Sequence, residues 1–249
     1  MSLLPPNFRN LLRDEYNSFL DQQRPGDITA DGAFAAELLN SGRKNAKTNE
    51  AGRLNYFYYP ASGPDAQYAT VDFEPNIYDG AFTPSSAYPI VTYTENQLIL
   101  AESLLRLSAT ANFTAALTAL NAVRAYHAGS SSPYAANGTV QYDAYTAADF
   151  ASGGIAAYGT ASANEGLLKE ILTEKYLSLI GEIEPFNDQR RATTLAGASN
   201  AAQSVVGVKP KRGGQLPQRF LYPQIEITTN PNTPAQSAAD LFTKTAVNQ

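Results

Sequence analysis

The stretch TYTENQLILAESLLRLSATANFTAALTALNAVRAYHAG, residues 92–129, decides the fold because it reads as two consecutive helices. Thr94 and Gln97 have the spacing of a capping box, in which two side chains satisfy N–H groups at a helix start. The link SATAN is short, so the second helix must run back antiparallel to the first, with Asn112 as its expected cap. The first helix has an apolar face at helical spacing, formed by Leu98, Ala101, Leu104, Leu105 and Leu107.

The second helix also has an apolar face, and Gly129 provides a stop signal at its end. Together the two helices have the length of one tetratricopeptide-type unit. A single unit of this kind cannot bury both of its faces, so other segments must pack on it. We find no second copy of the pattern, and the sequence therefore predicts no long solenoid. The apolar residues of the second helix are Phe113, Ala116, Leu117, Leu120 and Val123.

Composition excludes several classes of function. The chain has 249 residues, which is enough for one domain with a sizeable core. It has no cysteine, so a disulfide, a thiol nucleophile and a thiolate metal site are impossible. The net charge of -5, without a basic face, counts against a nucleic-acid partner. Only 16% of the residues are charged, and neutral polar residues take their place, which favours an extracytoplasmic protein or a neutral polar ligand.

Targeting signals are not evident in the sequence. No apolar run has the length needed to span a bilayer. The start, MSLLPPNFRN, lacks the apolar core and cleavage site of a signal peptide. If the protein is exported, we expect its signal peptide and any lipid anchor to be absent from this chain.

We expect a single mostly α-helical domain with long irregular loops and a few short strands. Its parts are N-terminal helices over 1–53, a tyrosine-rich loop region over 54–91, the helical hairpin over 92–129, and a C-terminal helix with loops over 130–249. The first part is predicted to hold a helix over 7–22, a shorter helix capped by Asp31, and an exposed polar loop from Arg43 to Gly52.

The C-terminal part contains the strongest single helical pattern. A helix is predicted to start at Ser162 or Asn164 and to close at Gly181, and a short helix is predicted near Ala147. The apolar stripe of the long helix covers almost four turns. Its members are Leu167, Leu168, Ile171, Leu172, Tyr176, Leu179 and Ile180.

The region 54–91 holds six of the fifteen tyrosines, and its prolines exclude a long helix. We expect an extended segment in which Leu54, Tyr56 and Tyr58 face one way. A glycan site needs flat aromatic faces for the sugar rings and hydrogen-bonding groups around them. Tyrosines packed under loops are the structural alternative. The predicted ligand-binding residues are Tyr56, Tyr58, Tyr59, Asn55, Asp72, Asn76 and Tyr78.

Three blocks of sequence, in order, resemble the SusD/RagB family. The first comprises TYTENQLILAESLLRL and AALTALNAVRAYHAG, which resemble the family's helical hairpin. The second, EILTEKYLSLIGEIEPFNDQRR, is similar to its later helix and turn, with Phe186 near the position of the family's usual tryptophan and Arg190 and Arg191 as the paired arginines. The third, QRFLYPQIEITTNPN, is similar to its closing element. The resemblance covers roughly Tyr88 to Asn232.

The resemblance implies a SusD-like α/α fold and a surface lipoprotein of Bacteroidetes-type outer membranes. Such proteins bind glycans or other nutrients, cover a TonB-dependent transporter and are not enzymes. The resemblance thus implies an oligosaccharide or other small nutrient and a transporter as partners, with no cofactor. Family members are considerably longer than this chain, which resembles their C-terminal half, and the lipid-anchor cysteine is missing here.

Two other functions are weighed against glycan capture. One is a helical scaffold whose only ligand is another protein. The other is a glycoside hydrolase, which would need two carboxylates facing each other across a groove. The acidic candidates are Glu170, Glu174, Glu182, Glu184 and Asp188, although carboxylates one turn apart, as at Glu170 and Glu174, are more typical of a solvated helix face. We predict no catalytic residue and no metal site: the calcium-like spacing of Asp72, Glu74, Asn76 and Asp79 lacks the remaining features of a calcium loop.

The remaining charged residues are assigned structural roles. Arg124, Arg190 and Arg191 are predicted to pair with carboxylates or with carbonyl groups near helix ends. His127, the single histidine, is interpreted as a helix-end residue, because one histidine without cysteine cannot build a zinc site or a triad easily.

Overall fold

The computed structural model describes residues 30, 32–60, 73–83, 86, 89–192, 195, 205–208 and 215–245. Within these ranges the chain is mostly helical, with a few short strands and irregular segments, as predicted. The helix predicted over 7–22 and the cap at Asp31 lie outside the described residues. No helix in the described ranges has the length and apolar character needed to cross a bilayer.

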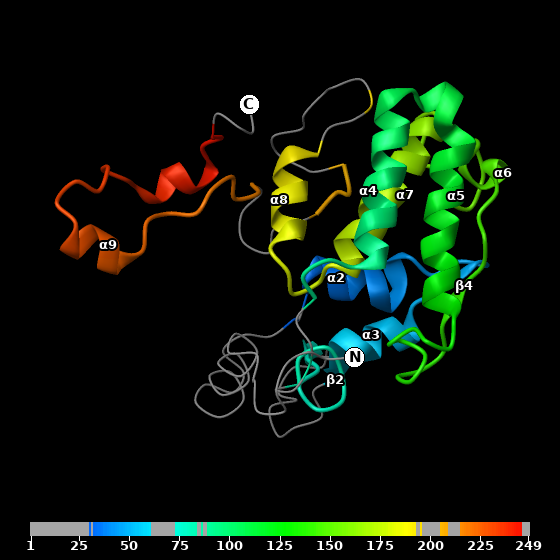
Figure 1. The fold of residues 1–249 in the computed structure, drawn as a ribbon, viewed down its shortest axis with the longest axis horizontal. Helices are drawn as coiled ribbons and strands as arrows, with labels where there is room; N and C mark the ends of the chain where they lie inside the picture. Colours follow the sequence, from blue (N-terminus) through cyan, green and yellow to red (C-terminus); the bar gives the residue numbers. More distant parts are fainter. Residues whose placement is uncertain are drawn as a thin grey trace.

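Three helices form the main body, and they are the ones that the sequence predicts. Helices α4 (Tyr93–Leu107) and α5 (Ala109–Ala128) form the antiparallel hairpin, and α7 (Ala163–Ser178) packs against both (Figure 1). Each fully buried leucine in such a core stabilises the fold by about 1.5–3 kcal/mol. The centre of this core is formed by Leu98, Ala101, Leu105, Ala116, Leu120, Val123, Leu167, Leu168 and Ile171.

The helix starts agree with the sequence prediction at α7 and differ at the hairpin. Ser162 caps α7, because its hydroxyl oxygen accepts a hydrogen bond from the N–H of Glu165. At α4 the cap is Thr92, whose Oγ1 accepts from the N–H of Glu95 at 3.0 Å, whereas Thr94 already belongs to the helix and is buried. Asn112 does not cap α5: its Nδ2 donates to the carbonyl of Leu104 at 3.0 Å and so connects the two helices.

The N-terminal elements lie against the end of the bundle. Helix α2 (Phe34–Glu37) continues into a π-helical turn, η2 (Leu38–Gly42), and α3 (Ala51–Phe57) follows (Figure 1). The extended segment predicted over 54–58 is therefore wrong up to Phe57. Arg53 and Phe57 are buried while Asn55 between them is exposed. A strand would place all three on one face, whereas a helix turns Asn55 away from the face that buries the other two.

The exposed loop predicted from Arg43 to Gly52 is also wrong. Strand β1 (Thr48–Asn49) in this segment pairs antiparallel with β4 (Gln141–Tyr142). A second antiparallel pair joins β2 (Tyr58–Pro60) to β3 (Phe73–Pro75). The short helix predicted near Ala147 is present as α6 (Ala147–Phe150).

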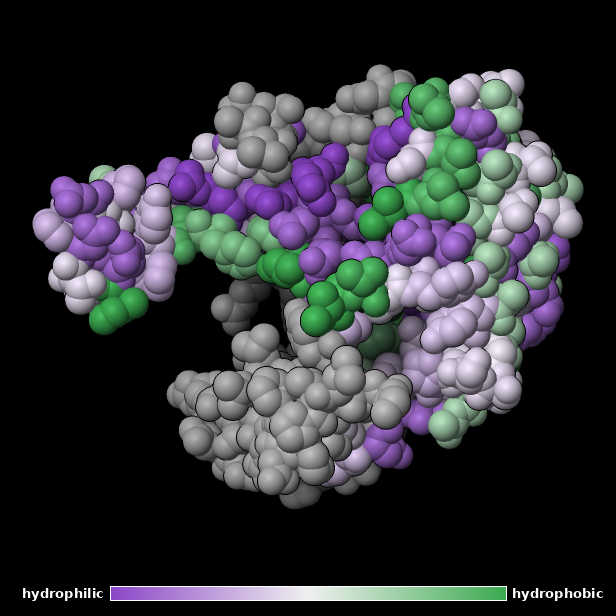
Figure 2. All heavy atoms as spheres, viewed as in Figure 1, coloured by the Kyte–Doolittle hydropathy of each residue, from purple (hydrophilic) through white to green (hydrophobic). Residues whose placement is uncertain are grey.

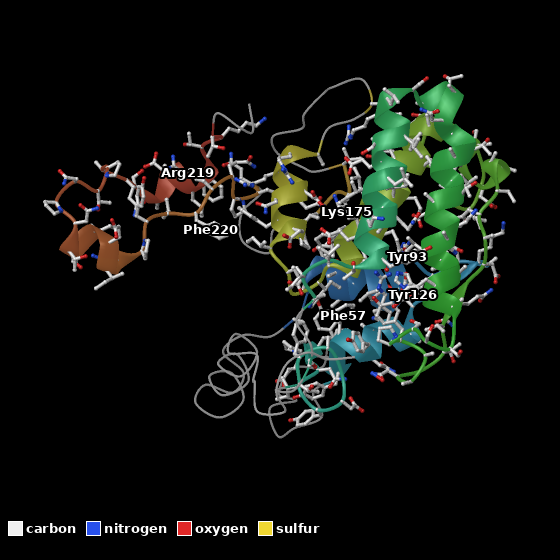
Figure 3. The ribbon with its side chains drawn as sticks, in the orientation of Figure 1. Phe57, Tyr93, Tyr126, Lys175, Arg219 and Phe220 are labelled. Atoms are coloured by element: carbon white, nitrogen blue, oxygen red, sulfur yellow. The ribbon has the colours of Figure 1, made fainter. Side chains whose placement is uncertain are left out.

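Helix α8 (Glu184–Arg191) leads from the bundle toward the C-terminal segment. Lys175 of α7 connects α8 to the bundle. Its Nζ lies 2.9 Å from Asp188 of α8 and 3.7 Å from Glu102 of α4 (Figure 3). Residues 215–245, with helix α9 (Gln224–Thr229) and the 3₁₀ turn η3 (Ala238–Phe242), project away from the bundle as an arm (Figure 1). Phe220 anchors the arm, with its ring centroid 4.9 Å from that of Phe186.

Candidate functional site

The predicted tyrosines occupy two different environments. Tyr58 is buried, and the ring of the partly buried Tyr56 packs edge-on against Tyr134 with centroids 5.4 Å apart. Both belong to a second apolar cluster, around Phe57 and Leu177, between α3 and the end of α7. Tyr56 and Tyr58 therefore pack within the fold, which was the structural alternative to a role in ligand binding.

Tyr59 and Tyr78 form an aromatic pair at the β2–β3 hairpin. Their ring centroids lie 5.0 Å apart in an edge-to-face arrangement, and the Tyr78 side chain is 65% exposed. The hydroxyl of Tyr59 donates to Glu74, and burial together with this hydrogen bond raises the pKa of Tyr59 above its usual value. These two rings are the part of the predicted aromatic set that is brought together near solvent.

The predicted polar groups are used within the turn that follows β3. Asn76 is buried: its Nδ2 donates to the carbonyl of Asn55 at 2.7 Å and to Asp79 Oδ1 at 2.8 Å, and its Oδ1 accepts from the N–H of Tyr78. The exposed Asn55 donates through Nδ2 to the carbonyl of Asn137. Asp72 lies outside the described residues. In the described part of the chain no group of three acidic or histidine side chains is placed to hold a metal ion.

The expectation of a solvated acidic face on α7 is wrong. Glu174 is completely buried, and only 14% of the Glu170 side chain is exposed. Arg43 lies against both of them: its Nη2 is 2.5 Å from Glu170 Oε1 and 2.6 Å from Glu174 Oε2. Their neighbours include two more arginines and a third glutamate. We call this set the buried ionic cluster; its members are Arg43, Glu50, Arg53, Arg124, Glu170, Glu174 and His127.

Charges of opposite sign alternate within the buried ionic cluster. Arg43 Nη1 lies 2.6 Å from Glu50, and Arg53 Nη1 lies 2.8 Å from Glu174 Oε1. Burial alone would raise the pKa of Glu174, but the charges of Arg43 and Arg53 outweigh it and hold this pKa well below its usual range. Glu174 is therefore ionised at neutral pH, and the guanidinium groups of Arg43 and Arg53 balance its charge.

His127 ends α5, as predicted, but it points into the buried ionic cluster. Its Nε2 lies 3.1 Å from Glu174 Oε1. Burial lowers the pKa of His127 despite the neighbouring carboxylate, so the imidazole is neutral at pH 7. Arg124 has the structural role that was predicted for it: its Nε donates to the carbonyl of Asp143 and its Nη2 to the carbonyl of Lys47, which holds β1 and β4 against α5.

A cleft of about 450 Å³ opens beside the buried ionic cluster, between α2 and α7. Aromatic side chains in its lining come from Phe34, Tyr145 and Tyr158, and hydrogen-bonding groups come from Asn45 and Thr173, among others. We call it the α2–α7 cleft. Its wall is completed by the segments 155–158 and 206–207.

Lys169 and Tyr158 form the side of the α2–α7 cleft opposite α2. Lys169 Nζ lies 3.9 Å above the centre of the Tyr158 ring, which is 39% exposed. Burial lowers the pKa of Lys169 below its usual value, while the charge of Glu170 opposes this effect. Within the described residues no carboxylate lies within ion-pair distance of the Lys169 ammonium group.

Sequence reasoning did not find this cleft, since its residues come from five separate stretches of the chain. Tyr158 falls in the loop-rich segment expected before the long C-terminal helix, and Lys169 lies within that helix without a predicted role. Glu170 is the only acidic side chain that lines the cleft within the described ranges, and it faces Arg43. The described residues therefore do not place a pair of carboxylates across this groove.

Comparisons with known proteins do not add to this picture. No protein-family model, curated protein or solved structure matches the chain.

Proposed function

We propose that this chain captures a short saccharide or a similar polar nutrient, without converting it, in the α2–α7 cleft. The observation that carries the proposal is the cleft itself. Its volume of about 450 Å³ lies within the range of small-molecule sites, and its lining combines aromatic rings with groups that donate and accept hydrogen bonds. This is the combination that a sugar ring requires.

The pair formed by Tyr59 and Tyr78 supports a broader glycan-binding surface. An exposed ring held edge-on by a neighbour is preorganised, so little side-chain entropy is lost when a sugar stacks on it. In this proposal the pair provides a secondary contact at the β2–β3 hairpin, and the cleft provides the main site.

The SusD/RagB resemblance supplies the biological setting of the proposal. It implies a tetratricopeptide-like SusD fold, a location at the surface of an outer membrane and transfer of the ligand to a TonB-dependent transporter. The antiparallel α4–α5 hairpin is compatible with the fold that the resemblance implies. The transporter and the membrane location remain part of the proposal.

A helical scaffold for another protein is the second candidate, and one observation favours it. Apolar side chains are exposed along α4 and at its start, as Figure 2 shows on the face that carries α4. Tyr93 and Tyr126 lie side by side there, with ring centroids 5.5 Å apart (Figure 3). The other exposed apolar residues of this face are Ile90, Val91, Ile99, Leu100 and Leu107.

Calorimetric titration with a panel of soluble poly- and oligosaccharides tests the proposal, with a search for shortened products afterwards. Capture in the cleft predicts saturable binding without cleavage, abolished by Tyr158→Ala. Tyr126→Ala is the matched control, because it removes a ring of similar exposure from the α4–α5 face and should leave binding unchanged.

The other outcomes distinguish the rivals. Cleavage of the polysaccharide would establish a hydrolase. Loss of binding in Tyr78→Ala but not in Tyr158→Ala would place the site at the β2–β3 hairpin. If no saccharide binds, the capture proposal fails and the scaffold becomes the better interpretation.

A further inference from the structure

The charges around the α2–α7 cleft do not cancel. The buried ionic cluster contains three guanidinium groups, of Arg43, Arg53 and Arg124, and three carboxylates, of Glu50, Glu170 and Glu174. Three positive and three negative charges sum to zero, and the neutral His127 adds none. Although Arg43 and Glu170 line the cleft, they therefore contribute no net charge to it.

Two further cations line the same cleft. Lys44 is exposed on the side of η2, and Lys169 lies on α7. In the described part of the chain neither ammonium group has a carboxylate within ion-pair distance, whereas Lys47 nearby is paired with Asp149 at 2.7 Å. Among the described residues the cleft thus has two positive charges without a carboxylate partner, although the chain as a whole has a net charge of -5.

The ammonium group of Lys169 has a defined position in the cleft. Its nitrogen lies over the ring of Tyr158, and this contact holds the charge at one wall of the cleft. Partial burial weakens the hydration of this charge, as the lowered pKa of Lys169 indicates, so a bound anion would regain interactions that water supplies incompletely. A preorganised, partly desolvated cation binds an anion more strongly than a fully solvated one does.

We propose that the α2–α7 cleft selects saccharides that carry an acidic group, a carboxylate or a sulfate ester, which Lys169 and Lys44 would bind while Tyr158 contacts the sugar ring. This inference depends on the proposed function and makes it more specific, since it names the class of sugar.

The test compares an acidic sugar with its neutral ester and with a sugar that carries a different acidic group. Calorimetry on the full chain would use digalacturonate, its neutral methyl ester and a sulfated galactose disaccharide. We expect the acidic sugars to bind about tenfold more tightly than the ester, because a charge-assisted contact is worth about 1.4 kcal/mol or more. The preference should shrink at high salt, which screens partly exposed charges. If digalacturonate binds more tightly than the sulfated disaccharide, the preferred acidic group is a carboxylate; the reverse order identifies a sulfate ester.

Variants separate this inference from the proposed function. Lys169→Met keeps an unbranched side chain beside Tyr158 without the charge and should remove most of the preference, with Lys44→Gln removing a smaller part. Arg191→Gln on α8, which removes an exposed charge outside the cleft, is the control and should keep the preference. Unchanged thermal unfolding would show that each variant is folded, and Lys169→Gln replaces Lys169→Met if that variant is not.

The contrary results are distinct. Equal binding of the acid and the ester overturns the inference, as does a preference for the acid that survives Lys169→Met. If saccharide binding is nevertheless lost in Tyr158→Ala, the capture proposal stands. If none of the three sugars nor any neutral saccharide binds, both proposals fail.

Discussion

Glu174 has no contact with solvent and depends on its cationic partners. Removing one cation from a buried ionic group leaves a charge that neither water nor protein neutralises fully, and the usual cost is about 3–5 kcal/mol. Because Arg43 still contacts Glu174, we expect Arg53→Met to lower the free energy of unfolding by about 3 kcal/mol, the low end of that range. Urea denaturation measures this loss.

Arg191→Met is the matched control for Arg53→Met. The Arg191 side chain is 53% exposed and lies 3.3 Å from Asp188, and such surface pairs contribute about 0–1 kcal/mol. Similar losses of free energy in the two variants would contradict a special role for the buried ionic cluster.

Gly80 is fixed by a close approach of the backbone. A Cβ atom at this position would lie 2.1 Å from the carbonyl oxygen of Tyr56 and 2.6 Å from the Asn76 side chain. Gly80→Ala should therefore destabilise the fold by about 1–3 kcal/mol, as overpacking typically does. Thermal unfolding measures the change.

Gly166 on α7 provides the comparison for Gly80. Its added Cβ would meet its nearest neighbour at 3.5 Å, an ordinary contact, and alanine is the better helix former. Gly166→Ala should leave stability unchanged or raise it by about 0.5–1 kcal/mol. A large loss at Gly166 together with no loss at Gly80 would show that the packing around these two positions is not as described.

Among the elements, α4 depends on the residue that precedes it. Thr92→Ala removes the acceptor of the Glu95 N–H and should cost about 1 kcal/mol. Thr118→Ala, an exposed substitution inside α5, is the control and should change the free energy of unfolding by less than about 0.5 kcal/mol. A loss at Thr92 no larger than that at Thr118 would mean that the cap does not contribute to stability.

The elements that the sequence predicts are those with strong local patterns. The hairpin and α7 follow from apolar periodicity, and Ser162 follows from cap chemistry. The position of the α4 cap was missed because Thr92 and Thr94 are both good caps and only the backbone decides between them. Helix α3 was missed because local spacing does not show that Arg53 is buried. Arg53 is buried where it donates to Glu174, a residue far along the chain.

At the scale of the whole molecule, two groups link stability to pH. The folded-state pKa of His127 lies below the unfolded value of 6.5, so the unfolded chain binds more protons and stability falls as pH drops through 6.5. The folded-state pKa of Glu174 lies below 4.5, so a second loss follows as pH falls below 4.5. Urea denaturation at several pH values from 8 to 4 should show both declines.

His127→Gln separates the two declines. The amide keeps a donor for Glu174 and does not titrate, so the loss near pH 6.5 should disappear while the loss below pH 4.5 remains. If both losses are unchanged in this variant, His127 is not the group responsible for the first one.

The candidate site shows the limit of local patterns. Aromatic richness drew attention to the tyrosines at 56–59 and 78. Spacing could not tell which rings pack inward, as Tyr58 does, and which face solvent, as Tyr78 does. The α2–α7 cleft could not be predicted at all, because Asn45, Tyr158 and Lys169 meet only after the helices have packed.

The long sequence separation within the buried ionic cluster has a consequence for folding kinetics. Arg53 and Glu174 are 121 residues apart, and Arg43 and Glu170 are 127 residues apart, whereas the α4–α5 hairpin forms from neighbouring residues. Contacts that close such long loops form late, after the local hairpin. Arg53→Met should therefore leave the refolding rate nearly unchanged and accelerate unfolding about 100-fold, as stopped-flow measurements in urea would show. The ionic contacts that organise the interior would then act mainly as a barrier to unfolding.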